Sequence, residues 1–217
     1  MSSGQRLDIV VVGAGGFGRE LLGWLWDCFS PQDYRVKGFV DDDPTPVPHD
    51  GTEFSVLGSP TDYLPYENDR FLLAIGSVSA RRKVVEAMLA KNARFLTMIH
   101  PTAVIAPTAI VGTGCVLYPY TLLANAAVLG DFVFLSNYAS VGHDARVGRY
   151  CNICPYGTLN GAATLEDDVF LGSHVTVGPG VTVRHNSKVS ANTAVVKDLP
   201  PSNFAFGNPA KVTACIG

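Results

Sequence analysis

From residue 99 onward, the hydrophobic positions of the chain repeat with a period of six. Every sixth residue is aliphatic, and the fourth residue after each of these is nearly always small or β-branched. Neither the 3.6-residue period of a helix nor the simple alternation of a strand produces this pattern. The spacing predicts short strands that turn a corner every six residues, three to a coil, so that the coils stack into a parallel β-helix around an aliphatic column. The aliphatic positions are Ile99, Ile105, Val111, Leu117, Leu123, Leu129, Leu135, Val141, Val147, Ile153, Leu159, Leu165, Leu171, Val177, Val183, Val189 and Val195.

The first hundred residues have a different pattern, in which apolar strands alternate with amphipathic helices. This alternation predicts a small α/β domain with a doubly wound parallel sheet. We therefore expect a Rossmann-like domain over residues 1–97 and the β-helix domain over residues 98–217. The expected strands lie at 8–12, 35–40 and 70–75, and the expected helices at 19–29 and 79–92.

A glycine-rich turn joins the first expected strand to the first expected helix. Its glycines match G-x-G-x-x-G in the strand-turn-helix context that lets backbone amides approach a phosphate. The domain has room for only one mononucleotide-binding half, so a nucleotide, or the nucleotide part of a larger substrate, fits better than NAD. The alternative is that the glycines only permit a tight turn. The candidate nucleotide-binding residues are Gly13, Gly15 and Gly16 of this turn, Asp41 and Asp42 after the second strand, and Gly76 after the third.

Within the repeats, the second and third residues after each aliphatic position are expected at outward corners. His143 and Asp144 occupy these places, with Asn125 one coil before the histidine and Gly161 one coil after it. A histidine accepts a proton near neutral pH, and an adjacent carboxylate can orient the ring and stabilise its charged form. We therefore expect His143 to be a general base supported by Asp144. The alternative is a surface histidine without a role.

Composition and charge narrow the classes of function. The chain of 217 residues is 47% hydrophobic and 16% charged, with a formal net charge of −3, which suits a folded protein and disfavours a nucleic-acid partner. One basic run, at residues 81–83, is expected on the solvated face of a helix, and contact with a phosphate is the alternative. Without a signal-peptide pattern or an apolar run of membrane-spanning length, we expect a cytoplasmic protein with no membrane partner.

The cysteines and the other histidines do not predict a metal site. Cys151 and Cys154 have CxxC spacing, but the repeat places Cys151 inward, like Cys115 two coils earlier, and Cys154 at an outward corner. We expect structural thiols and no metal. His174 and His185 fall on the other two corners of the coil, while His49 lies in a proline-rich loop and His100 at the domain junction.

Five segments in this order resemble the bacterial sugar O- and N-acetyltransferases of the sialic-acid O-acetyltransferase type. These hexapeptide-repeat acyltransferases have a left-handed β-helix, and they include nucleotide-aminosugar N-acetyltransferases. The resemblance covers nearly the whole chain. It is carried by IVVVGAGGFGRE, GFVDDDP, IHPTAVIAPTAIVGTG, SVGHDARVG and GNPAKV.

The resemblance also implies roles for single residues. It makes His143 the general base beside Asp144, in a direct transfer without an acyl-enzyme, and it associates the glycine turn and Asp41 and Asp42 with the nucleotide of the sugar donor. Acetyl-CoA is expected in a groove between neighbouring prisms. Its candidate contacts are Asn152, where related enzymes often have a second histidine, Gly161, and Lys211 of the closing segment.

We therefore expect an acetyl-CoA-dependent enzyme that N-acetylates a nucleotide-linked aminosugar. The alternatives are O-acetylation of a sialic-acid-like sugar, an NAD-binding oxidoreductase, and a non-catalytic trimeric module. In a monomer, outward aromatic side chains would expose a large apolar surface to water. We therefore predict a homotrimer with active sites between subunits. The aromatic residues expected on the outside are Tyr118, Tyr120, Phe132, Tyr138 and Tyr156.

Overall fold

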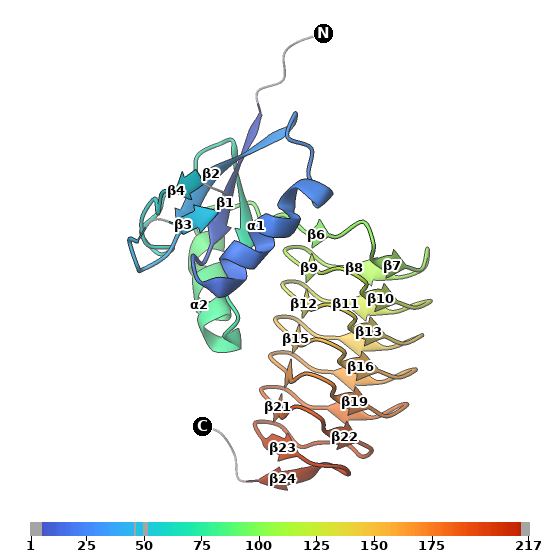
Figure 1. The fold of residues 1–217 in the computed structure, drawn as a ribbon. Coiled ribbons are helices and arrows are strands. Elements are labelled where there is room, and N and C mark those ends of the chain that lie inside the picture. The colour runs from blue at the N-terminus through green and yellow to red at the C-terminus, as the bar shows by residue number, and fades with distance from the viewer. Residues whose placement is uncertain (1–5, 46, 50–51, 214–217) are drawn as a thin grey trace. The chain divides into compact units, whose positions relative to one another are not determined.

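A computed structural model describes residues 6–45, 47–49 and 52–213. The chain divides into two compact units, Met1–Met98 and Ile99–Gly217 (Figure 1). Among the described residues, no helix has the length and apolar character needed to cross a membrane.

The first unit is built on a three-stranded parallel sheet in the order β2-β1-β5. The predicted strands and helices are present, with boundaries that differ by a few residues. A small antiparallel hairpin, β3 with β4, was not predicted, and it includes His49, which was expected in a loop. Because the sheet is parallel, the carboxyl ends of its strands meet at one edge. The elements are β1 (Leu7–Val12), α1 (Gly16–Cys28), β2 (Tyr34–Val40), β3 (Val47–His49), β4 (Thr52–Phe54), β5 (Asp69–Leu73) and α2 (Val78–Leu89).

Two glycines of the turn between β1 and α1 are required by packing. Gly13 has φ of +106°, and a Cβ there would lie 2.7 Å from the carbonyl oxygen of Ala74. A Cβ on Gly18 would overlap the carbonyl oxygen of Gly13 and lie 3.1 Å from the ring of Phe39. Gly15 and Gly16 differ, because no protein atom of another part of the chain lies closer than 3.9 Å to the Cβ position of either. In this turn, packing therefore requires Gly13 and Gly18, whereas Gly15 and Gly16 have free space beside them.

The second unit is the predicted parallel β-helix, in which two-residue strands stack in three columns (Figure 1). From β7 to β19, each strand pairs in parallel with the strand eighteen residues later: Leu123 lies beside Val141, and Val141 beside Leu159. At the end of the unit, β21 pairs with β23, and β24 pairs with β23 in the antiparallel direction. The strands are β6 (Met98–Ile99), β7 (Val104–Ile105), β8 (Ile110–Val111), β9 (Val116–Leu117), β10 (Leu122–Leu123), β11 (Val128–Leu129), β12 (Phe134–Leu135), β13 (Ser140–Val141), β14 (Arg146–Val147), β15 (Asn152–Ile153), β16 (Thr158–Leu159), β17 (Thr164–Leu165), β18 (Phe170–Leu171), β19 (Thr176–Val177), β20 (Thr182–Val183), β21 (Lys188–Val189), β22 (Ala194–Val195), β23 (Phe204–Phe206) and β24 (Lys211–Thr213).

The inward positions form one core, as the repeat predicts. From Leu117 to Val195 every sixth residue is essentially inaccessible to solvent, and small partners such as Ala127 and Cys151 fill the space between them. The repeat positions of the first coil are less covered, and Ile99 is 36% exposed. At most corners the third residue after the aliphatic position has a left-handed backbone, with φ near +60°.

Two of the five aromatic residues expected on the outside are buried instead. The ring of Phe132 occupies the space that a side chain at Gly114 would fill. It stacks on the ring of Tyr150, with 5.3 Å between the ring centroids. Tyr118 is only 4% exposed, because it directly follows an aliphatic position and does not reach the corner. The basic run also differs from expectation. Arg81 is fully buried, since α2 packs through the face that carries Arg81, Val85 and Met88.

The other three aromatic residues are exposed and form a column along one corner. Tyr120, Tyr138, Tyr156 and His174 follow one another at eighteen-residue intervals. Their rings stack with centroid distances of 5.0, 4.9 and 4.7 Å and are parallel to within 10°. A rigid column of this kind leaves a large apolar surface in contact with water.

Candidate active site

His143 lies on the corner that follows β13. Its Nδ1 is 2.8 Å from a carboxylate oxygen of Asp144, and the two side chains are 69% and 65% exposed. Asp144 has a left-handed backbone with φ of 60°. With Nδ1 facing a carboxylate, the other ring nitrogen, Nε2, is the one available to accept a proton. The dyad therefore has the arrangement of an oriented general base.

The coils on either side hold this corner rigidly. The backbone N–H of Asp144 donates to the carbonyl of Asn125, and that of Ala162 donates to the carbonyl of His143, at 3.0 and 2.8 Å. The imidazole lies across Gly161, so closely that a Cβ on that residue would be 2.6 Å from the ring carbon Cε1 and would overlap Nε2. The absence of a side chain at Gly161 thus sets the position of the ring.

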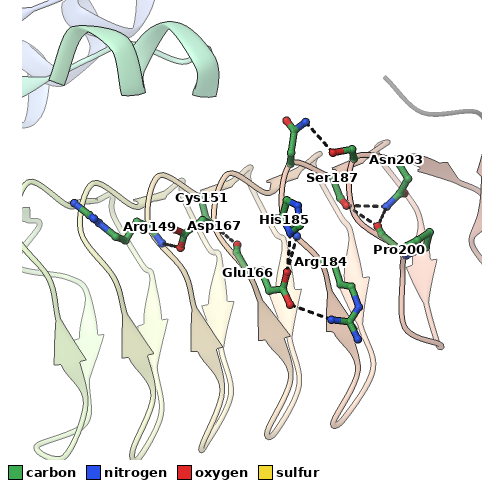
Figure 2. Close-up of polar contacts among 11 residues, drawn as sticks. Arg149, Cys151, Glu166, Asp167, Arg184, His185, Ser187, Pro200 and Asn203 are labelled. Carbon is green, nitrogen blue, oxygen red and sulfur yellow. Dashed lines mark hydrogen bonds and ion pairs between the residues drawn. The ribbon is translucent and has the colours of Figure 1, made fainter. Parts of the chain in front are cut away.

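The histidines on the other corners have different surroundings. His185 contacts Glu166 twice: its backbone N–H donates at 3.0 Å, and its Nδ1 lies 3.1 Å from the carboxylate (Figure 2). Arg184 donates to the other oxygen of Glu166 at 3.3 Å. These contacts lower the pKa of Glu166, and the hydrogen bond from the backbone N–H of His185 has the largest effect. His174 ends the aromatic column, so neither histidine shares a corner with His143, as the coil phase predicts.

Cys115 and Cys151 occupy inward positions in the core of the β-helix, as expected. The thiols of Cys115 and Cys151 donate to the carbonyls of Gly130 and Glu166, at 3.1 and 3.0 Å. Burial raises the pKa of Cys115 to about 11 and also raises the pKa of Cys154, which is half-buried rather than at an outward corner. Such thiols stay protonated at neutral pH and are poor metal ligands. Within the described ranges, no group of three or more His, Cys, Asp or Glu residues is arranged to hold a metal.

The first unit has a pocket of about 220 Å³ at the carboxyl edge of its sheet. Gly15 and Asp41, both predicted, contribute to its wall. Asp41 accepts the backbone N–H of Ala14 at 2.6 Å through one oxygen and that of Asp43 at 2.9 Å through the other, so it fixes the glycine turn. The residues that line the pocket are Ala14, Gly15, Arg19, Asp41, Asp43, Thr45 and Val47.

The other predicted nucleotide residues lie nearby without lining this pocket. Gly13 is packed beneath the turn, and Gly16 starts α1. Asp42 is exposed after β2, and Gly76 is exposed after β5, at the same edge of the sheet. Arg19, Asp43, Thr45 and Val47 were not predicted. The sequence pattern assigns Arg19 only to a helix, and the others lie in a segment without periodicity.

The three candidate acetyl-CoA contacts do not meet within one chain. Gly161 lies under the His143 ring. Asn152, in β15, is 8% exposed and donates through its amide to the sulfur of Cys154 at 3.4 Å. Lys211 is exposed in β24, the last strand of the sheet that contains β15.

Comparisons with known proteins agree with this architecture. The family model described as the PglD N-terminal domain matches residues 8–88. The crystal structure of PerB from Caulobacter crescentus, in complex with CoA and GDP-perosamine, is 30% identical in sequence. It superposes with a TM-score of 0.86 over 95% of this chain and 97% of that one. This chain belongs to the hexapeptide-repeat sugar acetyltransferases.

Other members of the family are similar in the same way. The acetyltransferase domain of PglB from Neisseria gonorrhoeae FA1090 is 28% identical, with a TM-score of 0.83 over 95% of this chain and 99% of that domain. GDP-perosamine N-acetyltransferase from Escherichia coli O157:H7 is 30% identical over 144 residues, and the match spans 62% of its length. The left-handed β-helix of the family is thus confirmed as the fold of the second unit.

Proposed function

We propose that this protein transfers the acetyl group of acetyl-CoA to the amine of a nucleotide-linked aminosugar. The observation that carries the proposal is the His143–Asp144 dyad, which lies across Gly161 on a rigid corner of the β-helix. The glycine-turn pocket supports a nucleotide. Because its sheet has three strands, it resembles one mononucleotide-binding half rather than a complete NAD site. The complex of PerB with CoA and GDP-perosamine supports the same pair of ligands.

The chemistry proposed is direct transfer. The sugar amine attacks the thioester carbonyl, and Nε2 of His143 takes the proton from the attacking nitrogen, while Asp144 stabilises the imidazolium. In this proposal, a backbone N–H near Gly161 donates to the oxyanion. When the intermediate collapses, the carbon–sulfur bond breaks and His143 returns a proton to the leaving thiolate of CoA. No cysteine is needed as a nucleophile.

The working enzyme is proposed to be a cytoplasmic homotrimer. The exposed column of Tyr120, Tyr138 and Tyr156 supports assembly, because a monomer would leave these rings in water. Neighbouring prisms would then enclose acetyl-CoA against Gly161, with Asn152 and Lys211 as further contacts. Sedimentation velocity at micromolar concentration should show a trimer, and a stable monomer would contradict the assembly.

A direct assay tests the activity. The purified protein is incubated with acetyl-CoA and a panel of GDP-, UDP- and dTDP-linked aminosugars, and thiol release is followed together with the mass of the sugar product. At least one aminosugar should gain a single acetyl group, while its hydroxyl analogue should react far more slowly. Preferred transfer to the hydroxyl analogue would contradict N-acetylation. If no sugar reacts and acetyl-CoA does not raise the melting temperature, the proposal is wrong.

A further inference from the structure

The pocket in the first unit has charges of both signs, and they differ in how they are held. On one wall Asp41 accepts two backbone N–H groups. Asp43 accepts both the hydroxyl and the backbone N–H of Thr45, at 2.6 and 3.0 Å, and these bonds lower the pKa of Asp43. Asp43 therefore stays ionised at neutral pH. An acidic wall suits donors such as ribose hydroxyls and base N–H groups, but it repels phosphate.

Among the described residues that line the pocket, Arg19 is the one cation. It is exposed, and no hydrogen bond or ion pair joins its guanidinium to another described residue. It lies in the first turns of α1, and its side chain leans back toward the start of the helix. One of its terminal nitrogens is 3.9 Å from the Cβ position of Gly16. The guanidinium is thus beside the first amides of α1, and this helix start has no side-chain cap.

The guanidinium of Arg19 and the first backbone amides of α1 make one side of the pocket favourable to anions. The first amides of a helix have no acceptor within the helix and attract negative charge, and a guanidinium binds phosphate oxygens through two parallel N–H groups. A diphosphate has two neighbouring anionic groups, one for each donor. A monophosphate has only one. Without Arg19, the two carboxylates would leave the pocket with net negative charge.

We propose that Arg19 binds a phosphate of the nucleotide-linked substrate and makes the pocket selective for nucleoside diphosphates over monophosphates. This inference rests on the proposed function, since it assigns a substrate-binding role within the same site. The reacting amine belongs to the sugar, so Arg19 acts as a positioning residue. Its loss should raise KM for the nucleotide sugar more than it lowers kcat.

Calorimetric titration of the full chain with GDP, GMP and guanosine, and with UDP, UMP and uridine, tests the proposal. The wild type should bind one diphosphate more tightly than its monophosphate. Arg19→Met should weaken diphosphate binding about ten-fold to a hundred-fold, the range for hydrogen bonds to charged groups, and should change nucleoside binding less than about two-fold. Arg19→Lys should bind the diphosphate more tightly than Arg19→Met but less tightly than wild type. Lysine keeps the positive charge but lacks the planar guanidinium that donates two parallel hydrogen bonds.

Two controls separate this role from general effects. Lys83→Met removes one positive charge from the exposed face of α2, outside the pocket, and should leave all affinities unchanged. Acetyl-CoA binding should be the same in every variant, which shows that the protein is folded. Equal loss for nucleoside and diphosphate in Arg19→Met, or no loss for either, overturns the role of Arg19. A wild type that binds no nucleotide overturns the proposed function as well. Diphosphate binding that depends on Arg19, without any acetyl transfer, overturns the proposed function alone.

Discussion

Replacement of Gly161 by alanine should reduce catalysis while leaving the fold intact. The new Cβ would lie 2.6 Å from Cε1 of His143, whereas non-bonded carbon atoms normally approach to roughly 3.5–4.0 Å. The imidazole must therefore move by roughly 1 Å. The ring is the exposed end of a side chain, and Gly161 is not among the glycines with a left-handed backbone, so the ring moves and the coil does not. We expect the melting temperature to stay within about 2 °C of wild type.

A displacement of about 1 Å in a catalytic group can lower the rate about 10²-fold. This factor corresponds to about 2.7 kcal/mol of transition-state stabilisation. Steady-state kinetics with a nucleotide aminosugar should show the loss in kcat, with unchanged binding of the nucleotide part. Gly23→Ala is the matched control, since Gly23 lies in α1 with no atom near its Cβ position. It should have wild-type kinetics.

A double variant makes the test specific to the histidine. If Gly161→Ala acts by moving the imidazole, it should have little further effect once His143 is already alanine, because the two changes remove the same interaction. Wild-type kcat in Gly161→Ala would refute the reasoning. An additive loss in the double variant would show that Gly161 acts through something other than the ring.

Three further changes test other parts of the molecule. Gly15→Val should weaken nucleotide-sugar binding but not acetyl-CoA binding, because Gly15 lines the pocket and a Cβ there would meet no other part of the protein within 4 Å; parallel loss of both affinities would contradict this. Lys37→Met should destabilise the protein by about 3 kcal/mol in urea unfolding, since it leaves the fully buried carboxylate of Asp69 without its cation, and a shift under 1 kcal/mol would be evidence against this role. The pKa of Glu166 is lowered in the folded state, so its stabilising effect is present above its unfolded pKa and lost as the pH falls through the folded value. Glu166→Gln should therefore be less stable than wild type near pH 7, with a difference that shrinks in acid; a difference independent of pH would contradict the linkage.

The β-helix and the corner position of His143 were predictable because one physical rule repeats along the chain. Every coil buries the same positions, so the residues beside His143 follow from counting eighteen in each direction. The side chains of single residues were less predictable. Phe132 occupies a corner like Tyr138, but it is buried because Gly114 in the preceding coil leaves room for its ring. Such burial depends on residues in other coils, which no local pattern contains.

The nucleotide pocket was predictable only in part. The glycine turn and Asp41 follow from the strand-turn-helix pattern, because the geometry of that motif is local. The rest of the lining, with Asp43, Thr45 and Val47, comes from a proline-rich segment that has neither helical nor strand periodicity. Arg19 occupies a polar position of an amphipathic helix, where a charged side chain is expected in any case. Only the pocket distinguishes it from other surface arginines.

The kinetics of His143→Ala test the proposed mechanism most directly. The variant should keep its oligomeric state and its affinities for acetyl-CoA and for the nucleotide, because the side chain is exposed and acts mainly in the transition state. Turnover should fall by about 10² to 10⁴, the usual contribution of a general base. His185→Ala, on another corner, should keep wild-type turnover. Near-normal turnover in His143→Ala, with an aminosugar already shown to be a substrate, would contradict the account.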